Sequence, residues 1–75
     1  MRQAELDAFN RRARIVYLHI LRTPVEGIAR SVGMSKVEVY RILSMVNTGS
    51  SYGMRLLDAA KKMRAAEERK VMREV

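Results

Sequence analysis

Apolar residues recur at intervals of three and four along almost the whole chain, and this spacing constrains the fold more than any other feature. It is the spacing of one face of an α-helix, whereas a half-buried strand would alternate apolar and polar residues. Four segments show it, at residues 2–21, 24–32, 35–46 and 51–73, and none alternates. We therefore expect an all-α fold, a small helical bundle with a long C-terminal helix.

The length and the residue types exclude several kinds of site. A chain of 75 residues is enough for one domain with a limited core. It has no cysteine and a single histidine, His19, so disulfides, thiolate metal sites and zinc sites built from several histidines are ruled out. A serine nucleophile needs a histidine oriented by a carboxylate, and no serine here has that pattern. We expect no enzymatic activity, no cofactor and no metal.

No apolar run approaches the roughly 20 residues of a membrane span. The N-terminal residues "MRQAELDAFNRR" lack the apolar core of a signal peptide. We expect a cytoplasmic protein without a membrane partner.

The charge balance indicates the class of partner. Fifteen Lys and Arg residues face eight Asp and Glu residues, which gives a net charge of +7. Such an excess favours a polyanion, with nucleic acid ahead of an anionic membrane.

The middle of the chain holds two short helices that begin and end with clear signals. Thr23 is suited to cap the first of them, and Glu26 three residues later completes a capping box. Ser35 and Glu38 repeat this pattern at the start of the second helix. Gly33 lies between the helices, where a left-handed residue commonly ends a helix. We expect two capped helices joined by a turn of about three residues.

The two short helices also carry the residues needed to pack on one another. Ala29 is small, as it must be where the second helix crosses close above it, and we expect Gly33 to have a positive φ. The apolar positions expected to form their shared core are Ile28, Val32, Met34, Val39 and Ile42. This is a helix-turn-helix arrangement.

The stretch "IARSVGMSKVEVYRIL" resembles the helix-turn-helix family of DNA-binding domains in bacterial and phage regulators. The small Ala, the turn Gly, the capping Ser and a later Val all coincide with the family pattern. The resemblance covers about 24 of the 75 residues. It implies a central helix-turn-helix that binds double-stranded DNA, with its second helix in the major groove.

Carried over by position, the resemblance also implies which residues meet DNA. Arg41 is the candidate for a bidentate contact to guanine, Lys36 for a base or phosphate, and Val37 for a thymine methyl. Thr23 and Arg30 are candidates for phosphate contacts. The residues expected to face the groove are Ser35, Lys36, Val37, Tyr40, Arg41 and Ser44.

The segment "NTGSSYG" is the only break in composition and reads as a loop. We divide the chain there into a helix-turn-helix core domain, residues 1–53, and a C-terminal helix, residues 54–75. In that helix Met54, Leu57 and Ala60 share one face, so the start of the helix should pack on the core and the rest should project.

A limited core without disulfide or metal favours self-association. We expect a two-fold dimer whose reading helices lie about 34 Å apart, one turn of DNA or a multiple of it. The residues assigned to this contact are Ile15, Leu18, Val71, Met72 and Val75, with other apolar residues of the last helix such as Leu56. The rival is a monomer whose last helix is solvated and offers its cations to the DNA backbone.

These observations predict a sequence-specific DNA-binding protein, most simply a transcriptional regulator. Two alternatives stay open. The same motif could serve a DNA-packaging or recombination accessory factor, or it could bind a protein such as an RNA polymerase subunit. Exposed cations on the second helix of the motif favour DNA, whereas an apolar exposed face favours a protein groove.

Overall fold

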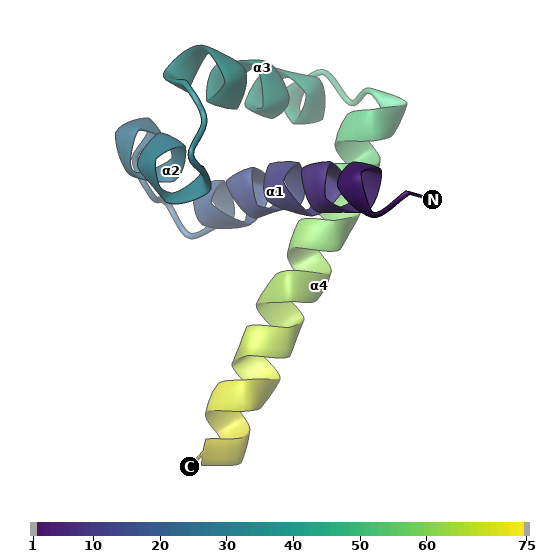
Figure 1. Cartoon of the computed structure of the whole chain (residues 1–75). Helices are drawn as coiled ribbons and strands as arrows, with labels where there is room; N and C mark the ends of the chain where they lie inside the picture. Colours follow the sequence, from purple (N-terminus) through teal and green to yellow (C-terminus); the bar gives the residue numbers. More distant parts are fainter. Residues whose placement is uncertain (1, 75) are drawn as a thin grey trace.

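The computed structural model describes residues 2–74, with side chains described through residue 71, and this part of the chain folds into four helices without a strand (Figure 1). Each helix begins and ends within one residue of its predicted position, and the all-α prediction is confirmed. The helices are α1 (Gln3–Ile20), α2 (Val25–Val32), α3 (Lys36–Asn47) and α4 (Ser51–Glu74).

α1 lies at the centre of the bundle and contacts the three other helices. α2 and α3 cover it on one side, and α4 crosses it and also packs against the end of α3 (Figure 1). The core is entirely apolar among the described residues. Its members are Ala13, Ile15, Val16, Ile28, Ala29, Val32, Val39, Ile42, Leu56 and Ala60.

The assignment of Ile15 to a dimer surface is wrong, because its side chain is 0% exposed in the core of the single chain. Leu18, placed with it, is half-buried and packs on the same core. Because α1 contacts three helices, its buried surface is wider than a single stripe of residues. Leu6 and Leu21, although apolar, are exposed near the two ends of the helix.

The buried face of α4 differs in the same way from the expected one. Leu56 and Ala60 are fully buried, whereas Met54 is 40% exposed and Leu57 is half-buried. Leu56 is therefore part of the core and is not a contact for a second copy. The division of the chain after residue 53 falls inside α4, whose first turns belong to the core.

The turn between α2 and α3 has the predicted geometry. Gly33 ends α2 with a φ of 68°, in the left-handed region that costs Gly nothing. Ser35 caps α3, and its Oγ accepts a hydrogen bond from the backbone N–H of Glu38 at 3.3 Å. One half of the predicted capping box differs, because the Glu38 carboxylate pairs with Arg41.

Thr23 does not cap α2, so that prediction is wrong. The cap position is Pro24, which has no side chain able to bond the helix. Thr23 instead belongs to the end of α1, where its backbone N–H donates to the Leu18 carbonyl at 3.0 Å. Arg22 makes that ending possible by adopting a φ of 65°, the one positive value among described residues other than glycine.

The turn between α3 and α4 comprises only residues 48–50, so it is shorter than the loop predicted from the segment "NTGSSYG". Ser50 caps α4, since its Oγ accepts a hydrogen bond from the N–H of Gly53 at 3.0 Å. Gly53 lies inside α4 and packs against the backbone of α3, where an added Cβ would overlap the Met45 carbonyl. The glycine therefore serves a close helix crossing.

Two aromatic rings and two arginines join the first half of α1 to the start of α4. The rings of Phe9 and Tyr52 meet edge to face at 6.0 Å between centroids. Arg12 donates from Nη1 to the Tyr52 hydroxyl at 2.9 Å, and the Arg55 guanidinium lies 5.5 Å from the Phe9 ring centre. These contacts hold the first turns of α4 against α1.

Candidate nucleic-acid interface

α3 has one buried face and one exposed face. Val39 and Ile42 pack into the core, and Leu43 is half-buried beside them. The opposite face is exposed, and the Lys36 side chain on it forms an ion pair with α2. This face carries the predicted groove-facing residues Lys36, Val37, Tyr40, Arg41 and Ser44, all exposed, and Ser35 is exposed at its N-terminal end.

Two of these exposed residues are apolar or aromatic. The side chains of Val37 and Tyr40 are 69% and 59% exposed and lie three residues apart on the helix. Exposed apolar groups that adjoin on a surface commonly mark a contact with a partner. A valine methyl can pack on a thymine methyl, and a tyrosine offers both a ring and a hydroxyl.

Both cations of this face are paired with carboxylates. Nζ of Lys36 lies 3.0 Å from Oε1 of Glu26 on α2, and Nη1 of Arg41 lies 3.4 Å from Oε1 of Glu38 on α3. All four side chains are at least 40% exposed. Exposed pairs contribute only about 0–1 kcal/mol each, so a phosphate or base can replace the carboxylate at little cost.

Of the two residues expected at phosphates, Thr23 precedes α2 and Arg30 lies near its C-terminal end. Arg30 is exposed in the last turn of α2, as a phosphate contact requires. Thr23 is half-buried, and its methyl carbon would lie 3.2 Å from a Cβ added at Gly27. The structure therefore does not gather Thr23 and Arg30 at one point.

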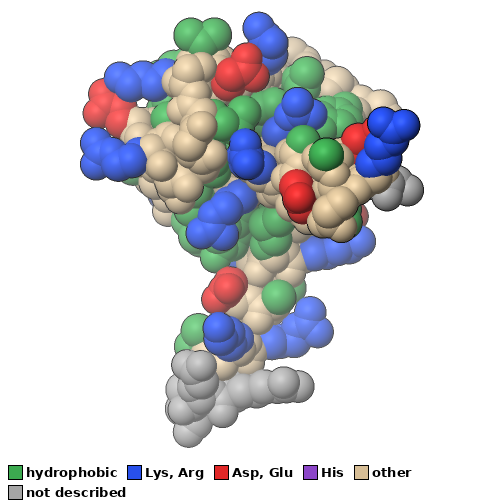
Figure 2. All heavy atoms as spheres, viewed as in Figure 1, with side chains coloured by type: hydrophobic (Ala, Val, Ile, Leu, Met, Phe, Trp, Pro, Cys, Tyr) green, Lys and Arg blue, Asp and Glu red, His purple; other side chains and the backbone are tan. Residues whose placement is uncertain are grey.

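The positive charge of the chain is distributed over several elements. Figure 2 shows Lys and Arg side chains spread over the bundle and along α4 on the face in view, with Asp and Glu side chains among them. Charge alone therefore does not distinguish α3 from the other helices, whereas the arrangement of its exposed residues does.

Within the part of the chain that has described side chains, no three His, Cys, Asp or Glu residues lie close enough together to hold a metal ion. None of the helices described there is long and apolar enough to cross a membrane.

Comparison with models of known protein families finds no match, and none of the curated proteins or solved structures compared with the chain is significantly similar to it. The chemistry of the exposed face must therefore be judged from its own residues.

Sequence reasoning missed the ion pair between Glu26 and Lys36. The two residues are ten positions apart on different helices, and only the angle between α2 and α3 brings them together. It also missed Arg22, since arginine rarely adopts a left-handed conformation and nothing in its neighbours predicts one.

Proposed function

We propose that the chain binds double-stranded DNA sequence-specifically, as a small transcriptional regulator, and that α2, the turn and α3 form a helix-turn-helix. The cytoplasm, where such a partner lies, is its proposed location. The observation that carries this proposal is the exposed face of α3, on which Lys36, Tyr40 and Arg41 adjoin on a helix whose other face is locked into the core. A rigid helix that presents cations and hydrogen-bonding groups together is suited to the major groove.

The ion pairs give this face a way to exchange partners. In the free chain Glu26 and Glu38 hold Lys36 and Arg41 in place. On contact with DNA, Arg41 can turn its guanidinium to the O6 and N7 of a guanine, and Lys36 can turn to a base or a phosphate. Arg30, exposed near the end of α2, is placed to meet the backbone of the same duplex.

The test is selection of bound duplexes from a random pool, followed by titration of the winning duplex at several salt concentrations. A DNA reader enriches a short sequence and loses affinity steeply as salt rises. A chain that enriches no sequence and binds no duplex at low salt does not have this function. A DNA-packaging or recombination factor would also enrich a sequence. Only the position of that sequence in a genome would distinguish such a factor from a transcriptional regulator.

The second candidate function is binding of another protein, for example a polymerase subunit, by the same face. Val37 and Tyr40 favour it, because they are the most exposed apolar and aromatic side chains of α3. The carboxylates beside both cations also lower the net charge of this face. The two functions separate in the salt titration, because a contact centred on Val37 and Tyr40 depends weakly on salt.

A further inference from the structure

α4 extends well beyond the bundle. Ala60 is its last buried residue and Met63 its last half-buried one, and every described side chain from Arg64 to Val71 is exposed. Figure 1 shows this part of α4 projecting away from the other helices, on the side opposite to α3. The projecting part therefore lacks packing on at least one side within a single chain.

A groove lies where the projecting part passes the end of α1. Tyr17 and Leu21 line it from α1, and Val71 lines it from α4. Leu21 is 47% exposed and Val71 is 58% exposed, so the groove presents open apolar surface from both α1 and α4. The charged residues that complete the lining, all from α4, are Arg64, Glu67 and Glu68.

The charges in this groove differ from those of the chain as a whole. The net charge of +7 makes two copies repel each other over most of their surface. In the groove two adjacent carboxylates, Glu67 and Glu68, outnumber the single cation Arg64, whose Nε lies 3.3 Å from Oε1 of Glu68. Because the groove carries both signs of charge, two copies that meet here can set opposite charges against each other.

We propose that this groove is the contact surface for a second copy of the chain, with the two α4 helices antiparallel around a two-fold axis near residue 66. Residues equally far on either side of the axis then face each other. Arg64 meets the partner's Glu68, and Glu68 meets the partner's Arg64. A parallel pair would instead bring Glu67 and Glu68 against their own copies, which is repulsive.

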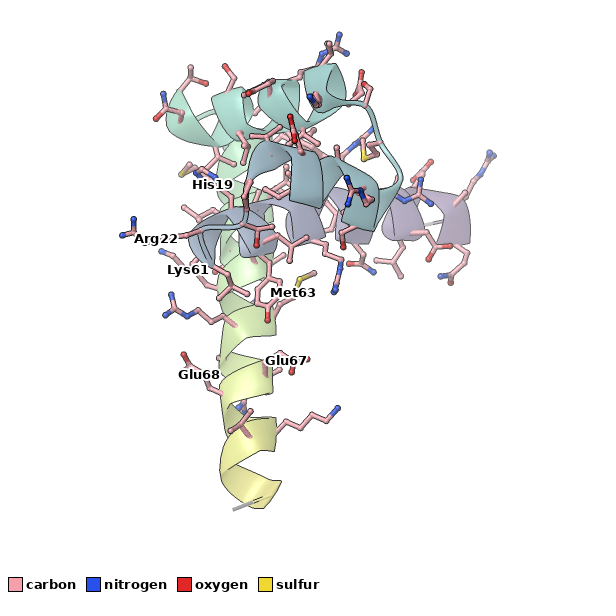
Figure 3. All side chains as sticks on the ribbon, turned by 90° about the vertical axis from the view of Figure 1, so that its left-hand side faces the viewer. His19, Arg22, Lys61, Met63, Glu67 and Glu68 are labelled. Atoms are coloured by element: carbon pink, nitrogen blue, oxygen red, sulfur yellow. The ribbon has the colours of Figure 1, made fainter. Side chains whose placement is uncertain are left out.

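The same register also matches the apolar residues. Val71 comes level with the partner's Lys61, because the two positions are equally far from the axis. In Figure 3 the labels of Lys61 and Arg22 lie at a similar level along α4, whereas Glu67 and Glu68 lie further towards its C-terminal end. In this register Val71 of each copy comes level with the last turn of the partner's α1, which carries Tyr17 and Leu21. Met72 and Val75, which we assigned to the dimer contact from sequence, fall outside the described side chains.

The antiparallel pair sets the direction of the two α3 faces. α3 and the C-terminal end of α4 lie at opposite ends of the molecule in both ribbon views (Figures 1 and 3). The dimer therefore carries its α3 faces at its two far ends, directed away from each other. It joins two duplexes and does not read both halves of one palindrome, which replaces the spacing of about 34 Å expected from sequence. This consequence rests on the proposed DNA binding, whereas the dimer itself does not.

Sedimentation of charge-reversal variants tests the contact. The wild-type chain should sediment at twice its 8.6 kDa at micromolar concentration. Arg64→Glu and Glu68→Arg should each raise the dimer dissociation constant about tenfold, since each reversal turns two attractive contacts into repulsive ones. Mixed together, the two variants should recover the wild-type affinity, because every Glu then faces an Arg.

Lys62→Glu and Asp58→Arg are matched controls, since they make the same charge changes on another side of α4, where these two residues pair with each other. They should leave the dimer unchanged, and circular dichroism should show all four variants folded. A wild-type chain of monomer mass overturns the proposal and leaves the groove to a different protein. A mixture of Arg64→Glu and Glu68→Arg that stays monomeric also overturns the proposal.

The direction of the helices is measured without DNA. The chain has no cysteine, so a single Ser51→Cys substitution gives one spin label per copy at the exposed start of α4. Antiparallel helices place the two labels about 45 Å apart, because about fifteen residues at 1.5 Å each lie on either side of the axis. Parallel helices place them about 10 Å apart, and that result would overturn the antiparallel arrangement. A dimer with the long distance that binds no duplex would contradict only the proposed function.

Discussion

Nζ of Lys36 lies 3.0 Å from Oε1 of Glu26, and this ion pair joins the first residue of α3 to the first turn of α2. Both side chains are more than half exposed, so the pair adds little to the free energy of unfolding. Its main consequence is electrostatic, because it neutralises a cation on the face that we propose meets DNA.

We expect Glu26→Gln to tighten binding to duplexes of any sequence, by about three- to tenfold at low salt, because Lys36 is then free for a phosphate. Fluorescence anisotropy of a labelled duplex measures this change. Asp58→Asn is the control, since it removes one carboxylate from α4 and raises the net charge equally. Equal effects from the two substitutions would show that Glu26 acts only through the net charge of the chain.

Arg30→Ala should weaken binding to all duplexes alike. It removes one phosphate contact and carries no sequence information, so the slope of affinity against salt should fall by about one unit. Arg69→Ala on the projecting part of α4 removes the same charge at a residue far from α3 and should change the slope much less. A larger effect of Arg69→Ala than of Arg30→Ala would favour the projecting part of α4 as the DNA-binding element.

Gly33→Val should lower the free energy of unfolding by more than about 1 kcal/mol. A β-branched residue is strained at the φ of 68° that the turn requires. Urea denaturation followed by circular dichroism gives the value. Ser31→Val, two residues earlier on the exposed side of α2, should cost less than about 0.5 kcal/mol. A Gly33→Val chain as stable as the wild type would mean that the turn does not need a left-handed residue.

Arg22→Gly should raise the free energy of unfolding by about 0.5–1 kcal/mol. Glycine relieves the left-handed strain at a φ of 65°, and its greater freedom in the unfolded chain offsets part of the gain. Arg11→Gly, inside α1, should instead destabilise the chain by about 1 kcal/mol. A lower melting temperature for Arg22→Gly would show that the arginine side chain makes a stabilising contact.

The helices could be predicted because their signals are local. Spacing at three and four, the Ser35 cap and the Gly33 turn each depend on a few neighbouring residues. The burial of Ile15 could not be predicted from one stripe, since it depends on how many helices surround α1. The burial of Leu56 and the exposure of Met54 could not be predicted either, because the face that α4 buries is set by the angle at which it crosses α1.

The exposed face of α3 could also be predicted, because it lies opposite two regularly spaced core residues, Val39 and Ile42. Its ion pair with α2 and the groove beside α4 could not. Both depend on contacts between residues far apart in the sequence, and a stretch of mixed charges such as Arg64 to Glu68 reads in one dimension as an ordinary solvated helix.

The measurement that most directly tests the α3 face is the affinity of Arg41→Ala for the duplex selected by the wild-type chain. The variant should lose about 1–3 kcal/mol of binding free energy on that duplex and should lose its preference at one base pair. Arg41→Lys should keep the charge and still lose the preference, because an ammonium cannot bind a guanine through two parallel hydrogen bonds. Unchanged affinity and unchanged sequence preference in Arg41→Ala would contradict the assignment of α3 as the DNA-reading helix.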